Sequence, residues 1–326
     1  MKIAVIGAGS WGTALISVLS QNQKVSWWIR SNKNLKDIKK FKRNPSYLTN
    51  LSLNTNNISL FNNIDDILKC NDLIVVAIPS EFLSSIFINK GPLLNNKFIL
   101  SATKGVVPER LITPHSFFTS INNNNNYGVI SGPCHAEEIA LEKQSYITIS
   151  SESLTHAEYL QNIFKSNFLQ ISISSDVVGA EYAAIIKNIY AILTGVCSGL
   201  GYGDNFIAVL ITSSANELNN LLNILDSKNR TITKAAYLGD LLVTCYSAHS
   251  RNRRLGFSIG KGVPLSKALS QTKMVAEGFH ACSSIYKILF NLKRTNHAPV
   301  LNCAYNIIHL GKDPQQEITT LTPLIS

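Results

Sequence analysis

The sequence predicts two domains: an N-terminal α/β domain built on a doubly wound parallel sheet, and a C-terminal all-helical domain. Residues 1 to about 175 alternate short β-rich runs with helical stretches. The β-rich runs are apolar throughout, which is typical of strands buried on both faces of a parallel sheet. After Asp176 the β-rich runs end and one helical pattern follows another. With 326 residues available, we expect a first domain over 1–176 and a second over 177–326.

The expected strands are short apolar runs separated by helical stretches. They are Lys2–Ile6, Val25–Ile29, Asp72–Ile78, Phe98–Ala102, Tyr127–Ile130, Tyr146–Ser150 and Phe168–Ser174. The second domain is expected to open with one long helix, Val177–Leu200, followed by helices near 205–225, 231–244, 251–260, 264–271, 275–291 and 299–310. The alternation of β-rich and helical stretches predicts a Rossmann-like doubly wound sheet. Because the alternation stops after Asp176, we expect helices alone in the rest of the chain.

The charge of the chain points to an anionic partner. The net charge is +10, but the basic residues are scattered and form no stripe interleaved with aromatic side chains. The densest basic cluster is the short segment Ser250–Arg254. These features favour a phosphorylated small molecule over nucleic acid.

The cysteines and the apolar runs indicate the compartment. Six cysteines occur without a C-x-x-C pair or a His spacing typical of zinc, so we expect no metal site and a reducing, cytoplasmic environment. No uninterrupted apolar run reaches the roughly 18 residues that span a bilayer, so we expect no stable membrane insertion.

A glycine-rich turn follows the first expected strand. Gly7, Gly9 and Gly12 match G-x-G-x-x-G, with Ser10 and Trp11 between them, and a helix is expected from about Thr13. The first glycine permits a tight turn, the second lets the backbone approach a pyrophosphate group, and the third lets the helix pack on the strand. We therefore predict dinucleotide binding, with a glycine-rich turn of another α/β fold as the alternative.

The residue after the second strand bears on the choice of cofactor. In NAD-selective sites an acidic residue at this position binds the ribose 2′-hydroxyl, but here the position holds Arg30 and no carboxylate is near. This side of the site can accept a 2′-phosphate, so NAD and NADP are both expected cofactors. The alternative is that Arg30 is a solvated loop residue.

Further motifs occur in order along the chain. They are Ala102-Thr103-Lys104-Gly105, Ser131-Gly132-Pro133-Cys134-His135-Ala136-Glu137-Glu138, Lys187-Asn188, Leu238-Gly239-Asp240, Ser250-Arg251-Asn252-Arg253-Arg254 and Val275-Ala276-Glu277-Gly278. Together with the glycine turn, this ordered set resembles bacterial NAD(P)-dependent glycerol-3-phosphate dehydrogenase from about residue 2 to residue 320. The resemblance implies reversible reduction of dihydroxyacetone phosphate to sn-glycerol 3-phosphate and a supply role in glycerophospholipid synthesis, and it is compatible with a homodimer.

The resemblance also implies roles for single residues. Lys187 matches the residue that transfers the proton. The implied substrate contacts are Lys104, Gly132, Lys187, Asp240, Ser250, Arg251 and Asn252. The implied cofactor contacts are Gly7, Gly9, Ser10, Trp11, Gly12, Arg30, Lys104, Ala136, Arg251, Val275 and Glu277. Cys134 departs from the Ser or Thr of many members, and because a thiol is a weak hydrogen-bond donor we assign it no role.

The proton-transfer role of Lys187 agrees with its surroundings in the sequence. It lies in the middle of a helical segment that is apolar nearly all round. Burial and a neighbouring cation both lower a lysine pKa toward neutrality, and Lys104 at the end of a strand is a candidate neighbour. The alternative is a lysine that extends from the helix to solvent.

Two polar residues of the second half also have two interpretations each. Asp240 is expected to orient Lys187 or to accept a substrate hydroxyl, or else to be a helix N-cap. Ser250 is expected to cap a helix whose N-terminus faces the substrate phosphate, with Arg251 adding a bidentate contact. The alternative for the Ser250–Arg254 cluster is a solvated basic face.

Two other functions share part of these features. A ketopantoate-reductase-like enzyme would have the glycine turn and a lysine on the helical domain but not the Ser250–Arg254 cluster. A non-catalytic NAD(H) sensor predicts the loss of Lys187 or Arg251, yet both are present.

Overall fold

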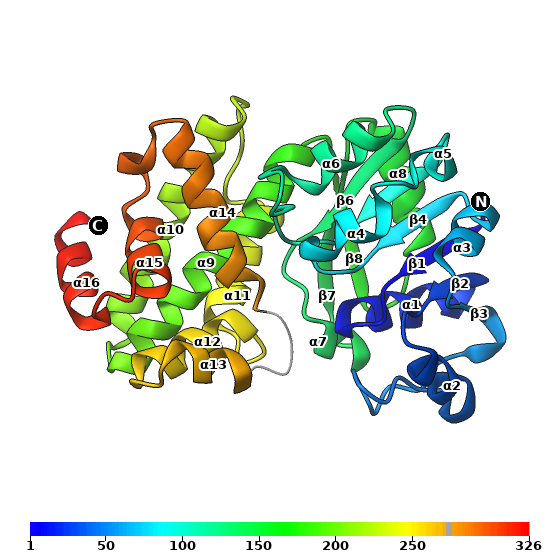
Figure 1. Cartoon of the computed structure of the whole chain (residues 1–326), viewed down its shortest axis with the longest axis horizontal. Helices are drawn as coiled ribbons and strands as arrows, with labels where there is room; N and C mark the ends of the chain where they lie inside the picture. The colour runs from blue at the N-terminus through cyan, green and yellow to red at the C-terminus, as the bar shows by residue number, and fades with distance from the viewer. Residues whose placement is uncertain (272–275, 326) are drawn as a thin grey trace. The chain divides into compact units, whose positions relative to one another are not determined.

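The computed structural model describes residues 1–271 and 276–325 (Figure 1). It divides into two compact units, one formed by Met1–Thr103 and Thr113–Val177 and the other by Lys104–Ile112 and Val178–Ser326. The first unit contains all the strands named here, and the second is helical. The short segment Lys104–Ile112 therefore groups with the helical unit, although it comes from the N-terminal half of the chain.

The first unit is built on an eight-stranded sheet with the order β3-β2-β1-β4-β5-β6-β7-β8. The strands are β1 (Ile3–Ile6), β2 (Val25–Trp28), β3 (Ile58–Phe61), β4 (Leu73–Val76), β5 (Phe98–Ser101), β6 (Asn126–Ser131), β7 (Ser145–Ser151) and β8 (Leu169–Ser174). Its helices are α1 (Ser10–Asn22), α2 (Asn32–Phe41), α3 (Ile64–Cys70), α4 (Leu83–Phe87), α5 (Gly91–Leu94), α6 (Pro114–Ile121), α7 (Ala136–Ala140) and α8 (Leu154–Ile163). The predicted fold class is confirmed.

Two details of the sheet differ from the prediction. Strand β3 was not expected, because Ile58-Ser59-Leu60-Phe61 is a partly exposed edge strand rather than a buried apolar run. Strands β6 and β7 pair antiparallel, whereas all other neighbours are parallel. The connection from β6 to β7 contains only the five-residue helix α7, which is too short for the helix that usually returns the chain in a parallel crossover.

Apolar side chains cover both faces of the sheet. Ile3 and Val5 of β1 share a core cluster with buried residues of α1, α7 and α8. Successive strand residues point to opposite faces, so the equally buried Ala4 and Ile6 face the other way. Buried residues of α3, α4 and α6 lie outside that cluster, as expected if they cover the second face. This two-sided burial explains the continuous apolar runs of the central strands.

The second unit consists of helices that bury a separate core. They are α9 (Val177–Leu200), α10 (Asp204–Leu225), the π-helical turn η3 (Ala235–Gly239), α11 (Asp240–Tyr246), α12 (Arg251–Gly260), α13 (Leu265–Gln271), α14 (Glu277–Asn291), α15 (Pro299–His309) and α16 (Pro314–Leu321). Helix α9 has the predicted bounds. Helix α16 and the π-helical turn were not predicted.

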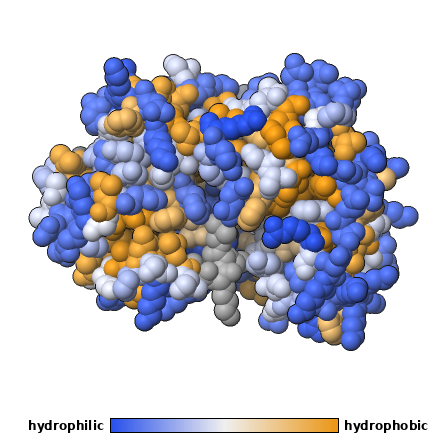
Figure 2. Space-filling view, in the orientation of Figure 1, coloured by the Kyte–Doolittle hydropathy of each residue, from blue (hydrophilic) through white to orange (hydrophobic). Residues whose placement is uncertain are grey.

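Helix α9 is the one helix, within the described residues, that is long and apolar enough to cross a membrane by length and composition. Glu181 and Lys187 interrupt its apolar run, in agreement with the expectation that no uninterrupted run is long enough to span a bilayer. Moreover, 89% of its most apolar window is buried inside the protein, so α9 is a core helix. On the face drawn in Figure 2, hydrophobic residues are interspersed with hydrophilic ones.

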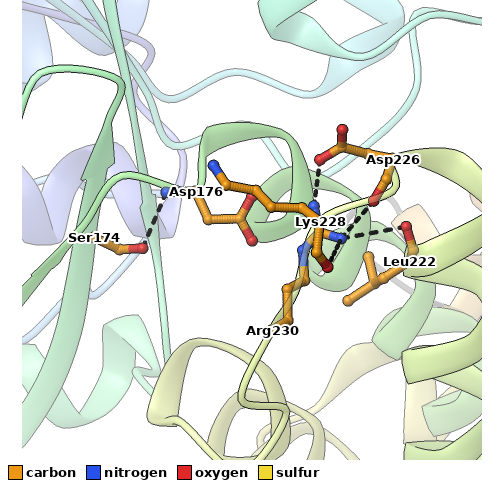
Figure 3. A network of polar contacts seen from close by, with 6 residues as sticks. All are labelled: Ser174, Asp176, Leu222, Asp226, Lys228 and Arg230. Atoms are coloured by element: carbon orange, nitrogen blue, oxygen red, sulfur yellow. Dashed lines mark hydrogen bonds and ion pairs between the residues drawn. The ribbon is translucent and has the colours of Figure 1, made fainter.

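The side chain of Arg230 closes the C-terminal end of α10 (Figure 3). Its guanidinium donates to the carbonyl oxygens of Asp226 at 2.6 Å and Lys228 at 3.2 Å, and it forms an ion pair with the Asp226 carboxylate. These bonds satisfy the carbonyl groups of the C-cap residue Asp226 and of the turn that follows α10. The turn that leads from α10 toward η3 is therefore held by one buried side chain.

Candidate active site

The glycine turn between β1 and α1 has the geometry of a phosphate-binding turn. Gly7 has φ +118°, and a Cβ there would lie 2.4 Å from the Ala77 carbonyl oxygen. A Cβ on Gly12 would lie 2.2 Å from the Gly7 carbonyl oxygen, whereas one on Gly9 would meet nothing within 4 Å. Gly7 and Gly12 are therefore required by packing, and Gly9 borders open space at the N-terminus of α1. This cradle fits the pyrophosphate of a dinucleotide.

The other candidate residues of the first unit lie at the same edge of the sheet. Gly132 follows β6 with φ +105°, and Ala136 begins α7, which packs against α1. Arg30 follows β2, and its guanidinium carbon lies 5.2 Å from the centre of the Phe82 ring. Because β1, β2 and β6 belong to the parallel part of the sheet, their carboxyl ends share one edge. Ligands of open α/β sheets bind at this edge.

The helical unit holds a buried lysine–carboxylate pair. Lys187 lies on α9 with 4% of its surface exposed, and its ammonium group donates a hydrogen bond to Oδ1 of Asp240, which is 1% exposed. Asp240 begins α11 directly after the π-helical turn η3, whose wide turn is a feature often found at functional sites. The second oxygen, Oδ2, is buried and has no hydrogen-bond partner among residues 1–271 and 276–325.

Burial lowers the pKa of Lys187 to about 8. Desolvation is the largest cause, and Lys104 lowers the pKa further by repulsion, while Asp240 acts in the opposite direction. The alternative interpretation, in which Lys187 extends to solvent, is therefore wrong. Lys104 belongs to the short segment that groups with the helical unit, which explains how a residue from the first half of the chain interacts with Lys187.

A chain of side-chain amides lies next to this pair. Asn188 follows Lys187 on α9, and its Oδ1 accepts a hydrogen bond from Nδ2 of Asn252 at 2.9 Å. The Oδ1 of Asn252 accepts one from the backbone N–H of Gly278 at 3.0 Å. These bonds link α9 with the starts of α12 and α14. Asn188 belongs to the Lys187-Asn188 motif, and no role was predicted for it from the sequence.

The basic cluster begins a helix that is fixed against α9. Ser250 is the N-cap of α12, since its hydroxyl accepts from the backbone N–H of Arg253, and Arg251 is the first residue of the helix. A Cβ on Gly256 would lie 1.9 Å from the Ile192 carbonyl oxygen, so the backbones of α12 and α9 are in direct contact. The capping role predicted for Ser250 is confirmed. This contact fixes the start of α12 relative to Lys187.

The predicted site residues thus fall into two groups, one in each unit. The turn residues Gly7, Gly9, Ser10, Trp11 and Gly12, with Arg30, Gly132 and Ala136, belong to the first unit, and Lys104, Lys187, Asp240, Ser250, Arg251, Asn252 and Glu277 belong to the second. Val275 lies outside the described residues. Cys134 is half-buried between Gly132 and α7. Among the described residues, no group of three or more His, Cys, Asp or Glu side chains is arranged to hold a metal ion.

Two family models match the chain and together cover most of it. The model for the NAD-dependent glycerol-3-phosphate dehydrogenase N-terminus matches residues 2–157, and the model for the C-terminus of the same family matches residues 176–319. The chain belongs to the NAD-dependent glycerol-3-phosphate dehydrogenase family. The predicted resemblance is confirmed, and with it the oxidoreductase class and the use of a nicotinamide cofactor.

Individual relatives agree with the family models over nearly the whole chain. The glycerol-3-phosphate dehydrogenase [NAD(P)+] of Clostridium botulinum (strain Alaska E43 / Type E3) is 35% identical over 322 residues, which cover 98% of this chain and 96% of the relative. That of Staphylococcus carnosus is 31% identical over 312 residues, 94% of this chain and 93% of the relative. The crystal structure of the Coxiella burnetii glycerol-3-phosphate dehydrogenase is 28% identical, covers 98% of both chains and has a TM-score of 0.93.

Proposed function

We propose that this chain reduces dihydroxyacetone phosphate to sn-glycerol 3-phosphate, with Lys187 giving the proton to the carbonyl oxygen. The observation that carries the proposal is the buried ammonium of Lys187, held against Asp240 at a pKa of about 8. Reduction of a ketone needs a hydride on carbon and a proton on oxygen. NADH or NADPH supplies the hydride when bound. An acid with a pKa near the working pH is best suited to give the proton and, in the reverse reaction, to take it back.

Asp240 is proposed to orient Lys187 and to receive a substrate hydroxyl. Its Oδ1 is engaged by Lys187, which fixes the direction of the ammonium group. Its Oδ2 is buried and without a partner among the described residues, so an O–H group brought by the substrate would satisfy it. The carboxylate also keeps the Lys187 pKa from falling further, so most of the enzyme carries the proton at neutral pH.

The start of α12 is proposed to bind the substrate phosphate. The N-terminus of a helix favours an anion, and Arg251 at its first position adds a fork of donors that matches phosphate geometry. Asn252 retains one amide hydrogen beyond the one that it gives to Asn188. Lys104 and Gly132 are proposed as further substrate contacts. The contact between α12 and α9 holds the phosphate-binding end at a constant distance from Lys187.

The cofactor is proposed to bind through the glycine turn and Arg30. The backbone of Gly7, Gly9 and Gly12 and the first turn of α1, with Ser10 and Trp11, would hold the pyrophosphate. Arg30 would lie beside the adenosine ribose. Ala136, Glu277, Val275, Arg251 and Lys104 complete the proposed set of cofactor contacts. In this proposal residues 1–176 form the dinucleotide-binding domain and residues 177–326 the substrate domain.

The proposed function agrees with a cytoplasmic enzyme that supplies glycerophospholipid synthesis. Its partners would be a phosphorylated small substrate and a dinucleotide, without nucleic acid or stable membrane insertion, and a homodimer is compatible with this function. The buried position of α9 supports a soluble enzyme.

Replacing Lys104 with Met is expected to move the pH dependence of the reaction. Only protonated Lys187 can give a proton, so kcat/KM for ketone reduction should be level below pH 8 and fall as the pH rises through about 8. Lys104 lowers the Lys187 pKa by repulsion, so its removal should raise that pKa and shift the falling limb to higher pH. The measurement is kcat/KM against pH for wild type and Lys104→Met. The control is Lys287→Met, which changes an exposed lysine on α14 and should leave the pH at which kcat/KM falls unchanged. If that pH is also unchanged in Lys104→Met, Lys104 does not lower the pKa of Lys187.

Replacing Arg30 with Asp is expected to change cofactor preference. The guanidinium over the Phe82 ring can pair with a 2′-phosphate and also stack on adenine, so we expect wild type to use NADPH and NADH. The carboxylate introduced by Arg30→Asp would repel the 2′-phosphate and could accept a hydrogen bond from the free ribose hydroxyl. The measurement is the ratio of kcat/KM for NADPH to that for NADH. The ratio should fall in Arg30→Asp but not in Lys33→Asp, which changes an exposed lysine of α2. If the ratio of kcat/KM for NADPH to that for NADH is the same in wild type and Arg30→Asp, Arg30 is a solvated loop residue that does not contact the cofactor.

A further inference from the structure

The three consecutive carbonyl groups of the glycine turn each accept a hydrogen bond from a buried side chain. The indole Nε1 of Trp27 donates to the Gly7 oxygen at 2.8 Å. The amide Nδ2 of Asn44 donates to the Ala8 oxygen at 3.0 Å. The hydroxyl of Thr13 donates to the Gly9 oxygen at 2.8 Å. Trp27, Asn44 and Thr13 all have 0% exposure, and we call these three side chains the carbonyl clamp.

Asn44 is the centre of the carbonyl clamp. Its Nδ2 uses one hydrogen for the Ala8 oxygen and the other for the hydroxyl oxygen of Thr13, at 2.8 Å. Its Oδ1 accepts from the backbone N–H groups of Ser46 and Tyr47 at 3.0 and 3.3 Å. Every donor and acceptor of this amide therefore has a partner. A buried amide is costly unless all its groups are bonded, so the side chain has one stable orientation here.

The clamp determines which groups the turn can offer to an anion. Carbonyl oxygens carry partial negative charge and would repel a phosphate group. In a planar trans peptide the C=O and the N–H of the next residue point in opposite directions. Holding the oxygens of Gly7, Ala8 and Gly9 toward the protein interior therefore aims the following N–H groups the other way. Gly9 lies in the middle of this stretch. A Cβ added to Gly9 would meet no atom within 4 Å, so there is open space beside its backbone.

We propose that Asn44, with Trp27 and Thr13, is a positioning residue that holds the glycine turn in the form that binds a pyrophosphate group. The inference rests on the proposed function, because it takes the turn to be the cofactor's pyrophosphate site. It goes beyond the motif, since G-x-G-x-x-G contains none of the three clamp residues. Asn44 comes from the segment after α2, and Trp27 comes from β2, so two neighbouring elements pre-organise the turn before any ligand arrives.

The test measures cofactor affinity separately from turnover. The variants are Asn44→Ala, Thr13→Val, which keeps the side-chain volume, and Trp27→Phe, which keeps an aromatic ring. The readouts are the Kd for ADP-ribose by calorimetry and KM and kcat with NADH. Each lost hydrogen bond is worth on the order of 1 kcal/mol, so we expect the Kd and the KM for NADH to rise by roughly 5- to 10-fold, with kcat at saturating NADH unchanged. The matched control is Asn71→Ala, because Asn71 is a buried asparagine of the same unit whose side chain donates to the Ile67 carbonyl oxygen of its own helix end, away from the glycine turn.

The outcomes separate a positioning role from a merely structural one. A structural role would lower the active fraction, and thus the apparent kcat, in Asn44→Ala and Asn71→Ala alike, without raising the Kd. That result would contradict the positioning role of the carbonyl clamp. A wild-type Kd in both Thr13→Val and Trp27→Phe would contradict it as well. If Asn44→Ala does not fold, these two milder variants decide the matter. Failure of the wild type to bind ADP-ribose would instead contradict the proposed function itself.

Discussion

Lys187→Met is expected to lower kcat by roughly 10²- to 10⁴-fold, the usual contribution of a positioned general acid. Methionine keeps a long side chain on α9 but cannot carry a proton, so the carbonyl oxygen would have to take its proton from water. NADH binding should be nearly unchanged, because the glycine turn and Arg30 belong to the other unit. The measurement is kcat for dihydroxyacetone phosphate reduction together with the Kd for NADH.

Lys287→Met is the matched control for this substitution. Lys287 is an exposed lysine of α14, and its replacement should leave kcat as in wild type. Removing Lys187 leaves the Asp240 carboxylate buried without its cation, which is destabilising. The melting temperature and the NADH Kd must therefore show that the variant is folded. A folded Lys187→Met protein that keeps more than about half of the wild-type rate would contradict a catalytic role for Lys187.

Arg251→Ala is expected to raise the KM for dihydroxyacetone phosphate by roughly 30-fold or more, because removing one partner of a hydrogen-bonded charge pair costs at least about 2 kcal/mol. Phosphate-free dihydroxyacetone should be a poor substrate of the wild type and should lose little further activity in the variant. The measurement is kcat/KM for both substrates in both proteins.

Arg254→Ala is the control on the same helix. Arg254 is exposed on α12 three residues beyond Arg251, and its loss should affect neither substrate strongly. If Arg251→Ala reduces kcat/KM equally for dihydroxyacetone phosphate and for dihydroxyacetone, then Arg251 does not recognise the phosphate group.

The features that local sequence determines were predictable. The glycine turn, the apolar central strands and helix α9 each have a pattern that one short segment carries. The Ser250 cap also follows from local chemistry, because a serine before a helix accepts from its first turn. The edge strand β3 was missed because its residues are partly exposed and the apolar pattern weakens there.

The contacts between distant residues were not predictable in the same way. The bond from Asn252 to Asn188 joins residues 64 positions apart, and the bond from Asn44 to Thr13 joins residues 31 positions apart. In a chain rich in asparagine, nothing local distinguishes these residues from solvated ones. The π-helical turn before Asp240 was not predictable either, because Gly239-Asp240 alone resembles an ordinary helix start.

The dehydrogenase activity is tested by NADH consumption by the purified protein when one candidate substrate at a time is added. We expect NADH to be oxidised when dihydroxyacetone phosphate is added, sn-glycerol 3-phosphate to form in equal amount, and ketopantoate to give no reaction. Oxidation of NADH with ketopantoate but not with dihydroxyacetone phosphate would contradict glycerol-3-phosphate dehydrogenase activity and indicate a ketopantoate reductase. Binding of NADH without its oxidation by either substrate would contradict this activity and indicate a non-catalytic sensor.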